Sequence, residues 1–398
     1  MVPPWSAQLA GFYFFHFGLL GLLMPYLPLY LQERGLSGGL IGILMGLLMG
    51  TKLLSPPLIG LWIDRRGELL RPLRVSLFAT LLAWLLFMSV REQWTLSIAI
   101  ATFALTWNAT LPAFETLTLH RLGPERIGQY GRIRLWGSVG FIAAGIGGAL
   151  WLDTPVHLLY RFPIAGLALV SGMLVLGASR NGREPSAVSG SARRGWMALL
   201  GRPGVPGFLL TLFLLHLSHG PYYALFTLYL EGLGFAPARI GLLWILGVVA
   251  EVGLFWVAPA LFARFGRRSL LIAGLILTAV RWALIGTLAA HPVILMIAQV
   301  LHLASFGLCH AVGMSYVHAL FPGTLQGRGQ ALYSALGFGA GGVVGSLMGG
   351  LLWAAGWRSE IYLLAMLAAM LAALIAWRAI PFWLPAHASP APNRVGSD

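Results

Sequence analysis

The chain has 398 residues, of which 58% are hydrophobic and 10% charged, and its formal net charge is +14. A soluble domain carries about 25% charged residues, so this composition excludes an ordinary soluble fold and indicates a protein embedded in lipid. The positive charge does not point to a nucleic-acid partner, because the arginines stand in short segments between apolar runs, as is typical of membrane topology.

Apolar runs long enough to cross a hydrocarbon core of about 30 Å follow one another along the whole chain. Together with the charged, glycine and proline residues between them, these runs predict an all-α polytopic membrane protein with twelve transmembrane helices. The first six cover residues 7–31, 38–62, 73–90, 94–118, 135–152 and 157–178, and the second six cover 205–230, 239–262, 269–289, 292–318, 330–354 and 358–379.

A polar segment separates the two groups of spans. Residues 179–204 are rich in glycine, serine and arginine, which predicts a linker. Residues 381–398 are rich in proline and alanine and predict a disordered tail. The expected domains are therefore one six-helix bundle over 1–178 and a second over 205–380.

The arginines predict an orientation. Of the 25 arginines, 19 lie in segments on the side of the linker and five on the opposite side, while Arg281 lies within a span. Because positive loop charge marks the cytoplasmic side, we expect the linker, the tail and both termini in the cytoplasm of a bacterium, with the helices in its inner membrane.

The sequences of the two halves of the chain resemble each other, and the matching spans cross the membrane in the same direction. Such a duplication predicts two bundles related by a pseudo-twofold axis along the membrane normal, with a cavity between them. The resemblance is carried by pairs 199 residues apart: Ile41-Gly42 and Ile240-Gly241, Tyr30-Leu31 and Tyr229-Leu230, and Arg65-Arg-Gly67 and Arg264-Phe-Gly266.

The segment after the second span carries a recognisable motif. Gly60-Leu-Trp-Ile-Asp64-Arg65-Arg-Gly67 resembles the signature of the loop between helices 2 and 3 in the major facilitator superfamily. The resemblance implies a secondary transporter that works by alternating access, with Gly60, Asp64, Arg65 and Gly67 in a gating loop.

Further stretches resemble one subgroup of that superfamily more closely, the phenylpropionic acid permease family. The resemblance runs from Phe12 to about Ala376 and implies transport of an aromatic carboxylate. It is carried by Tyr130-Gly-Arg-Ile-Arg134-Leu-Trp-Gly-Ser-Val, Leu243-Trp-Ile-Leu-Gly-Val-Val-Ala-Glu251-Val, Val280-Arg281-Trp and Gln299-Val-Leu-His302.

The chain is also similar, more distantly, to the proton-coupled lactose permease group. That group has acidic, arginine and histidine residues at positions matched here by Glu115, Arg134, Glu251, Arg281 and His302. It also has a second acid three residues after the histidine, where Ser305 stands in this chain. The resemblance implies a substrate and proton pathway through the matched residues.

Five charged residues are candidates for the membrane interior, four of them inside predicted spans and away from most of the loop charges, and Arg134 at the boundary of the span over 135–152. A charge at the centre of a spanning helix costs about 2.5–3.5 kcal/mol on insertion scales, so such a residue is a functional candidate by default. The five are Lys52, Glu115, Arg134, Glu251 and Arg281, and Lys52 is the only lysine in the chain.

Each of the five also has a structural interpretation. Lys52 could extend its flexible stem toward the membrane surface. Arg134 could be an anchor at the cytoplasmic boundary, and Glu115 could neutralise Arg134 or Arg121. Glu251 and Arg281 could form a structural ion pair.

Three positive charges against two negative ones leave one excess positive charge in the expected cavity. An anionic substrate would compensate that charge, which favours a carboxylate held by the guanidinium fork of Arg134 or Arg281. Lys52 falls opposite Glu251 at the 199-residue offset. Since a buried lysine can lose its proton, we expect these two to form a switchable pair; attraction of the substrate by a single basic charge is the alternative.

The histidines and aromatic residues supply further candidates. His302 is a candidate proton relay beside Glu251 and Arg281. His216, His219 and Tyr223 share one face of a helix. For His16, His219 and His310 we expect neutral hydrogen bonds between helices. The remaining candidates for the cavity wall are Trp136 and Tyr333.

The sequence thus predicts a proton-coupled symporter of a small organic anion. A sugar or nucleoside symporter and a drug efflux antiporter are the alternatives among transporters. An intramembrane hydrolase built on Ser315 is disfavoured, because no histidine is placed as its base, so an enzyme is not expected. The predicted partners are the substrate, protons and the bilayer; the chain is expected to be a monomer without a cofactor, and the histidines lack the spacing of a metal site.

Overall fold

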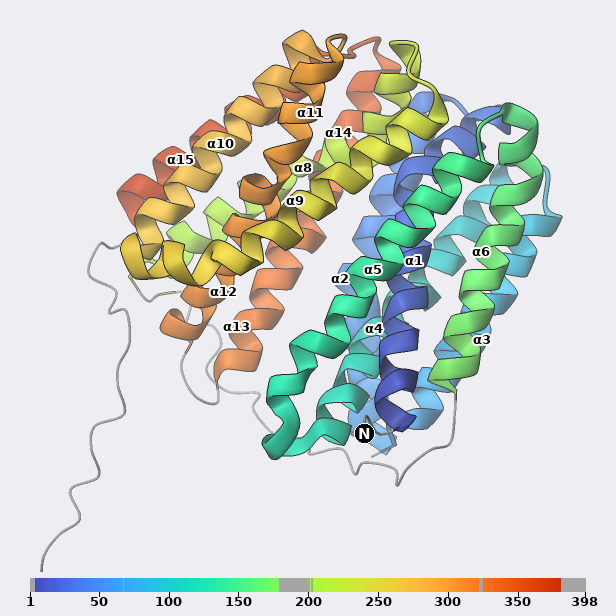
Figure 1. The fold of residues 1–398 in the computed structure, drawn as a ribbon, viewed down its shortest axis with the longest axis horizontal. Coiled ribbons are helices and arrows are strands. Elements are labelled where there is room, and N and C mark those ends of the chain that lie inside the picture. The colour runs from blue at the N-terminus through green and yellow to red at the C-terminus, as the bar shows by residue number, and fades with distance from the viewer. Residues whose placement is uncertain (1–3, 67, 179–200, 202, 322–324, 381–398) are drawn as a thin grey trace, which may run out of the picture.

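The computed structural model describes residues 4–66, 68–178, 201, 203–321 and 325–380, and within these ranges all regular structure is helical. The helices form two bundles that stand side by side (Figure 1), one from each half of the chain. The predicted linker, apart from residues 201, 203 and 204, and the predicted tail lie outside the described residues.

The first bundle contains the helices of the first half. Local side-chain contacts fix where some of these helices begin. At Glu92 the carboxylate accepts hydrogen bonds from the backbone N–H groups of Thr95 (3.0 Å) and Trp94 (3.1 Å). These bonds cap the next helix and hold the pKa of Glu92 below its usual value. The helices are α1 (Pro4–Glu33), α2 (Gly38–Arg66), α3 (Leu70–Ser89), α4 (Gln93–Arg126), the short η1 (Ile127–Gln129), α5 (Tyr130–Trp151) and α6 (Pro155–Gly177).

The second bundle repeats this arrangement, with two of its six spans broken into segments. Its helices are α8 (Val205–Gly232), α9 (Pro237–Arg264), α10 (Arg267–Leu288), α11 (Pro292–Val300), η2 (Leu303–Leu308), α12 (Cys309–Leu320), α13 (Gln326–Tyr333), η4 (Ser334–Gly341), α14 (Gly342–Ala354) and α15 (Glu360–Ala379). All twelve predicted spans coincide with helical stretches of the structure.

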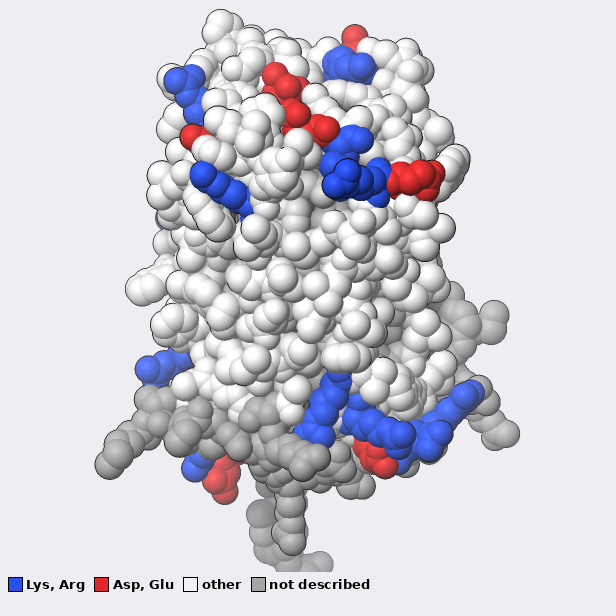
Figure 2. Space-filling model, turned by 90° about the vertical axis from the view of Figure 1, so that its right-hand side faces the viewer, with Lys and Arg blue, Asp and Glu red and all other residues white. Residues whose placement is uncertain are grey.

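Eleven of the described stretches are long and apolar enough to cross a membrane. The twelfth predicted span lies in α8, which is 28 residues long and carries His216, His219 and the run Pro221-Tyr222-Tyr223. Its neighbours α14 and α15 enclose it, so these polar groups face protein and not lipid. On the face shown in Figure 2, charged side chains gather near both ends of the molecule, and an uncharged belt lies between them.

Two segments of the second bundle are π-helical. These are η2, which joins α11 to α12, and η4, which joins α13 to α14. A π turn holds one more residue than an α turn, and such turns are frequent at functional sites. Each predicted span over 292–318 and 330–354 is therefore interrupted near its middle.

The bundles contact each other mainly near the end at which α1 and α8 end, called here the closed end. There α2 packs on α14, and a Cβ atom built on Gly42 would lie 2.7 Å from the Gly350 Cα. On the opposite side of the same interface α5 packs on α9, and Tyr26 fills the space above Gly241. Toward the end at which α1 begins, the bundles diverge (Figure 1), and α12 and α13 pack within their own bundle.

Candidate functional site

Arg134 of α5 and Glu115 of α4 form an ion pair within the first bundle. Arg134 Nε lies 3.6 Å from Glu115 Oε1, and the side chains are 32% and 34% exposed. Tyr130 donates a hydrogen bond to the same carboxylate oxygen at 3.3 Å. The guanidinium also lies over the ring of Phe17, 3.9 Å from its centroid, so one face of Arg134 is shielded by an aromatic ring.

Glu251 of α9 faces this pair from the second bundle. Its nearest ionisable partner is His302, whose Nε2 lies 3.8 Å from Glu251 Oε2, and this contact is an ion pair only when the imidazole is protonated. The charge of Arg134 acts on Glu251 and on His310 across the boundary between the bundles. We take these partly exposed charges of the two bundles together as the candidate interbundle site.

Arg281 of α10 lies deeper, inside the second bundle, and is fully buried. Its Nε donates to the Ala298 carbonyl (3.0 Å), one terminal nitrogen donates to Ser305 Oγ (3.0 Å), and the other lies 3.4 Å from Gln299 Oε1. Its guanidinium carbon lies 4.2 Å from the centroid of the Tyr222 ring and 4.5 Å from that of the Trp282 ring. Among the described residues no carboxylate comes within 4.0 Å of it, so neutral acceptors and aromatic faces alone compensate its charge.

Lys52 of α2 does not make the ion pair with Glu251 that was expected for it. Its only hydrogen-bond contact with another described residue is a 3.7 Å approach of Nζ to Met49 Sδ, one turn back on the same helix. Its charge acts on His16 in its own bundle and on His216 in the other. The predicted Lys52–Glu251 pair is absent from the described part of the chain, and so is the alternative Glu251–Arg281 pair.

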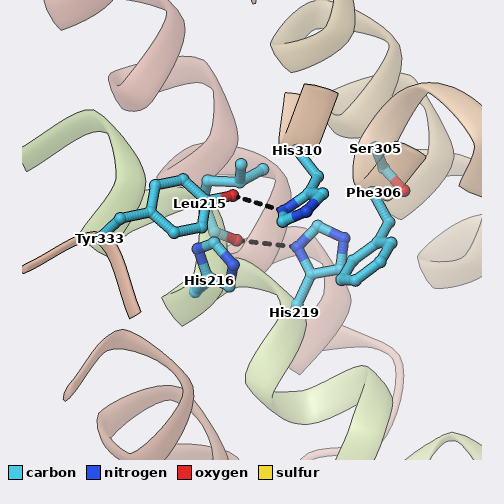
Figure 3. A pocket seen from close by; sticks show the side chains of 7 residues that line it. All are labelled: Leu215, His216, His219, Ser305, Phe306, His310 and Tyr333. Atoms are coloured by element: carbon cyan, nitrogen blue, oxygen red, sulfur yellow. Dashed lines mark hydrogen bonds between the residues drawn. The ribbon is translucent and has the colours of Figure 1, made fainter. Parts of the chain in front are cut away.

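The buried and half-buried histidines other than His302 form two groups. His16 of α1 stacks on the rings of Phe12 and Trp107 and lies 3.5 Å from Thr110 Oγ1 of α4, so its expected bond between helices is present. His216, His219 and His310 belong to the second bundle and line one small cavity (Figure 3).

That cavity, called here the histidine cavity, lies between α8, η2, α12 and the end of α13. Its His310 Nδ1 lies 2.9 Å from the hydroxyl of Tyr333, a bond between helices as expected. His219 departs from the expectation, because its Nδ1 bonds the carbonyl of Leu215 on its own helix at 2.8 Å. The cavity is lined by Leu215, His216, His219, Ser305, Phe306, His310 and Tyr333.

Two aromatic candidates differ in their outcome. Tyr223 stacks on His219 and Trp244 and is half-buried, so it joins the polar interior of the second bundle. Trp136 is 51% exposed and makes no ring contact with another described residue, so the structure does not bring it to the other candidates.

The sequence motifs contain Trp282 and Gln299, and Ser305 was noted beside them, but the sequence did not predict that these residues surround Arg281. Tyr222, Trp282 and Ser305 meet around its guanidinium, and the buried Gln299 accepts from the Tyr222 hydroxyl at 2.9 Å. The available signal was the presence of polar residues at 299 and 305 within an otherwise apolar run.

The loop motif after α2 is only partly described. Gly60 lies in α2 with open space around its Cα, and Arg65 is exposed in the last turn of that helix. Asp64 is within α2, and Gly67 lies outside the described residues. No group of three or more His, Cys, Asp or Glu side chains in the described part of the chain is arranged to hold a metal ion.

Comparison with known proteins shows which family this sequence matches. Residues 6–364 match the sequence profile of the MFS_1 like family. The chain is 31% identical over 346 residues to the "Probable 3-phenylpropionic acid transporter" of Escherichia coli (strain K12), which spans 85% of this chain and 89% of the relative. It is 29% identical over 338 residues to the maltose permease of Geobacillus stearothermophilus, covering 83% of each chain.

Solved structures agree with this at the level of the fold. The crystal structure of the nucleoside transporter NupG superposes with a TM-score of 0.75 at 17% identity, covering 94% of this chain and 98% of that one. The POT family transporter PepTSo gives a TM-score of 0.71 at 13% identity, covering 95% and 97%. The chain therefore belongs to the MFS_1 like family of the major facilitator superfamily and is a multi-pass membrane transporter.

Proposed function

We propose that the protein is a proton-coupled symporter that imports a small organic anion, in the first place an aromatic monocarboxylate, by alternating access. The observation that carries this proposal is the buried charge balance. Lys52 and Arg281 have no carboxylate within 4.0 Å among the described residues, whereas Arg134 is paired with Glu115. A buried positive charge without a counter-ion is costly, and a bound carboxylate would supply one.

An aromatic acid suits the surroundings of this charge. The rings of Tyr222, Trp282 and Trp244 lie together around and beside Arg281, with Tyr222 and Trp244 centroids 4.6 Å apart. A flat substrate ring would find stacking partners there. The relative that shares 31% identity is named as a probable 3-phenylpropionic acid transporter, which supports the same substrate class.

Proton coupling is assigned to Glu251 and His302. They face each other at 3.8 Å, and the Glu251 side chain is 17% exposed at the interbundle site, so a proton can reach it when the site is open. In the proposed cycle Glu251 takes a proton from outside, the anion binds, and the bundles rock to open the other end. One proton and one monovalent anion carry no net charge together, so the pH gradient drives this uptake, at about 1.4 kcal/mol per pH unit.

The orientation follows from the arginine distribution. We propose that residues 1–178 and 205–380 are the two moving bundles of a monomer in the bacterial inner membrane, that 179–204 and 381–398 are cytoplasmic, and that both termini are cytoplasmic. The diverging end of Figure 1 then faces the cytoplasm, and the structure corresponds to an inward-facing state.

A neutral sugar is the second candidate. It is favoured by the identity to the maltose permease and by the partly exposed Arg134–Glu115 pair, whose groups can bind sugar hydroxyls. Uptake of radiolabelled 3-phenylpropionate into proteoliposomes with an inward proton gradient separates the two. We expect gradient-driven uptake by the wild type and its loss in Arg281→Gln, since a hydrogen bond to a charged group contributes about 1.5–3 kcal/mol.

Arg378→Gln is the matched control, because Arg378 is an exposed arginine near the end of α15. If folded wild-type protein takes up maltose but none of the monocarboxylates 3-phenylpropionate, benzoate and cinnamate, the anion proposal is wrong.

A further inference from the structure

A groove lies between α5 and α6 on the first bundle, called here the α5–α6 groove. In Figure 1 α1 is visible between these two helices, and Leu22 of α1, which is 2% exposed, forms the floor of the groove. The volume of the groove is about 370 Å³, which falls within the range of about 300–1,000 Å³ that ligand pockets cover. This space is large enough for an organic molecule.

Small residues on both walls keep the groove open. On α5 the lining residues Ala144, Gly147 and Trp151 are three and four positions apart, so they share one face of that helix. A Cβ atom built on Gly147 meets nothing within 4 Å. On α6 the lining residues Ala165 and Leu169 stand one turn apart. Because α5 and α6 each pack mainly on α1 and hardly on each other, the space between them stays unfilled by protein.

The chemistry and depth of the groove suit a hydrocarbon chain. Apart from Trp151, every residue that lines it is glycine, alanine or leucine, and the lining residues belong to apolar spans or, like Leu152, directly follow one. A water molecule there would find no polar side chains to bond. From Arg161 to Leu169 the helix advances eight residues, or about 12 Å. One leaflet contributes about 15 Å of a hydrocarbon core of about 30 Å, so the groove has the length of one leaflet.

Arg161 stands at the end of the groove nearer the start of α6. It precedes Ala165 by one turn, on the same face of the helix. Its Nη1 donates to the Trp151 carbonyl at 3.1 Å, and its guanidinium carbon lies 5.7 Å from the centroid of the Trp151 ring. The side chain thus extends to the last residue of α5, and a tryptophan at a helix end is typical of the headgroup level of a bilayer.

The guanidinium of Arg161 has donors and charge left for an anion. It carries five N–H donors, and its hydrogen-bond partner among the described residues is the Trp151 carbonyl. The neighbouring carboxylate of Asp153 is bound by His157, whose Nδ1 lies 2.5 Å from Asp153 Oδ1. No carboxylate in the described part of the chain lies within 4.0 Å of the guanidinium.

We propose that the α5–α6 groove binds a phospholipid, with one acyl chain between the helices and the phosphodiester on Arg161. Basic pockets between transmembrane helices bind lipid headgroups, and the guanidinium fork matches the geometry of a phosphate. The groove supplies the apolar part of the site and Arg161 supplies the opposite charge. This inference goes beyond the proposed function, because it does not depend on which substrate the protein transports.

The α5 wall of the groove is also part of the closed end. Gly148 lines the groove and packs on the ring of Tyr26 so closely that a Cβ atom would not fit between them. The Tyr26 hydroxyl donates to the Gly145 carbonyl at 3.0 Å, and its ring fills the space above Gly241 of the second bundle. The bound acyl chain therefore packs on the helix that carries this contact between the bundles, on the face that protein leaves uncovered.

The first test counts the lipids that the purified full-length protein retains. Native mass spectrometry is performed with palmitoyl-oleoyl phosphatidylglycerol as the probe. In Gly147→Leu the new side chain has room in the groove and takes the place of the acyl chain, so this variant should retain one lipid fewer than the wild type. Gly253→Leu is the matched control, because a Cβ atom there also meets nothing within 4 Å, but in α9. If Gly147→Leu retains as many lipids as the wild type, the inference is overturned.

The second test concerns the headgroup. Arg161→Gln should bind phosphatidylglycerol about tenfold more weakly, since it loses a hydrogen bond between charged groups. Its affinity for a diacylglycerol with the same chains, which has no phosphate, should not change. Arg91→Gln is the control, because Arg91 is exposed between α3 and α4 and is not part of the groove. Equal affinity of Arg161→Gln and Arg91→Gln for phosphatidylglycerol would contradict the assignment of the phosphate.

A third test uses the wild type alone and so covers variants that do not fold. Phosphatidylglycerol with a photoactivatable diazirine in its chain is irradiated on the protein, and the labelled peptides are identified. Enrichment of label in residues 144–152 and 165–169 supports the inference, whereas an even spread over the membrane-spanning helices contradicts it. If 3-phenylpropionate displaces the lipid from these residues, the groove belongs to the substrate route and the lipid assignment is wrong.

Discussion

Gln32 and Glu231 occupy equivalent positions in the two halves of the chain, 199 residues apart, and their side chains meet at the closed end. Gln32 Nε2 donates to Glu231 Oε2 at 3.2 Å. Residues related by a twofold axis can touch each other only if both lie beside that axis. The pair therefore marks the point where the pseudo-twofold axis leaves the closed end of the molecule.

This contact predicts that the two positions separate in each transport cycle. In the variant Gln32→Cys with Glu231→Cys, a short bifunctional thiol reagent should join the bundles and abolish uptake, and a reducible linker should allow uptake to return on reduction. The native Cys309 is buried and should not react. The two single-cysteine variants are the controls, and full uptake by the cross-linked protein would show that the closed end does not open.

A second prediction concerns the approach of α2 to α14. A side chain at Gly42 would press on the Gly350 backbone, so Gly42→Leu should disfavour the closed arrangement of this end. Overpacking of this kind costs about 1–3 kcal/mol, which is about a 5–150-fold shift between states. We expect a lower yield of the 32–231 cross-link and slower uptake.

Gly253→Leu is the matched control, because it makes the same substitution at a position where the added side chain meets no neighbouring atoms. Gly253 lies in α9, and a Cβ atom built on it meets nothing within 4 Å. Its cross-link yield should match that of the unsubstituted double-cysteine protein. Equal yields in Gly42→Leu would mean that the glycine is not needed for closure.

The sequence predicted the helices well because membrane spans depend on length and apolar composition, which are local properties. It also identified Arg134, Glu115, Glu251 and Arg281 as interior charges. It did not predict the π segments, since an extra residue in one turn has no compositional signature. These segments change which side chains around Ser305 and His310 face the same space.

The 199-residue offset of the repeat correctly identifies equivalent positions in the two bundles, but it does not predict which of these equivalent residues touch each other. Lys52 and Glu251 are 199 residues apart, as are Gln32 and Glu231, yet only the second pair touches. Equivalence under a twofold axis places two residues at equal distances from the axis on opposite sides. Two equivalent residues touch only where their distance from the axis is short, and this distance cannot be read from the sequence.

The last prediction follows from this correction. Glu251→Gln should lose gradient-driven uptake but retain exchange of labelled for unlabelled anion, because a glutamine at this position cannot release a proton. Lys52→Ala should not restore the lost activity, since the two residues make no ion pair in the structure. In a double-mutant cycle scored by the rate of anion exchange, which Glu251→Gln retains, Lys52→Ala and Glu251→Gln should be additive to within about 0.5 kcal/mol.

His302→Gln supplies the positive comparison, because His302 does face Glu251 at 3.8 Å. Residues in one hydrogen-bond or ion-pair network show interaction energies of about 0.5–3 kcal/mol, so Glu251→Gln and His302→Gln should be non-additive. Rescue of Glu251→Gln by Lys52→Ala would contradict this assignment. It would mean that Lys52 reaches Glu251 in another state of the cycle, where the bundles close at the end at which α1 begins.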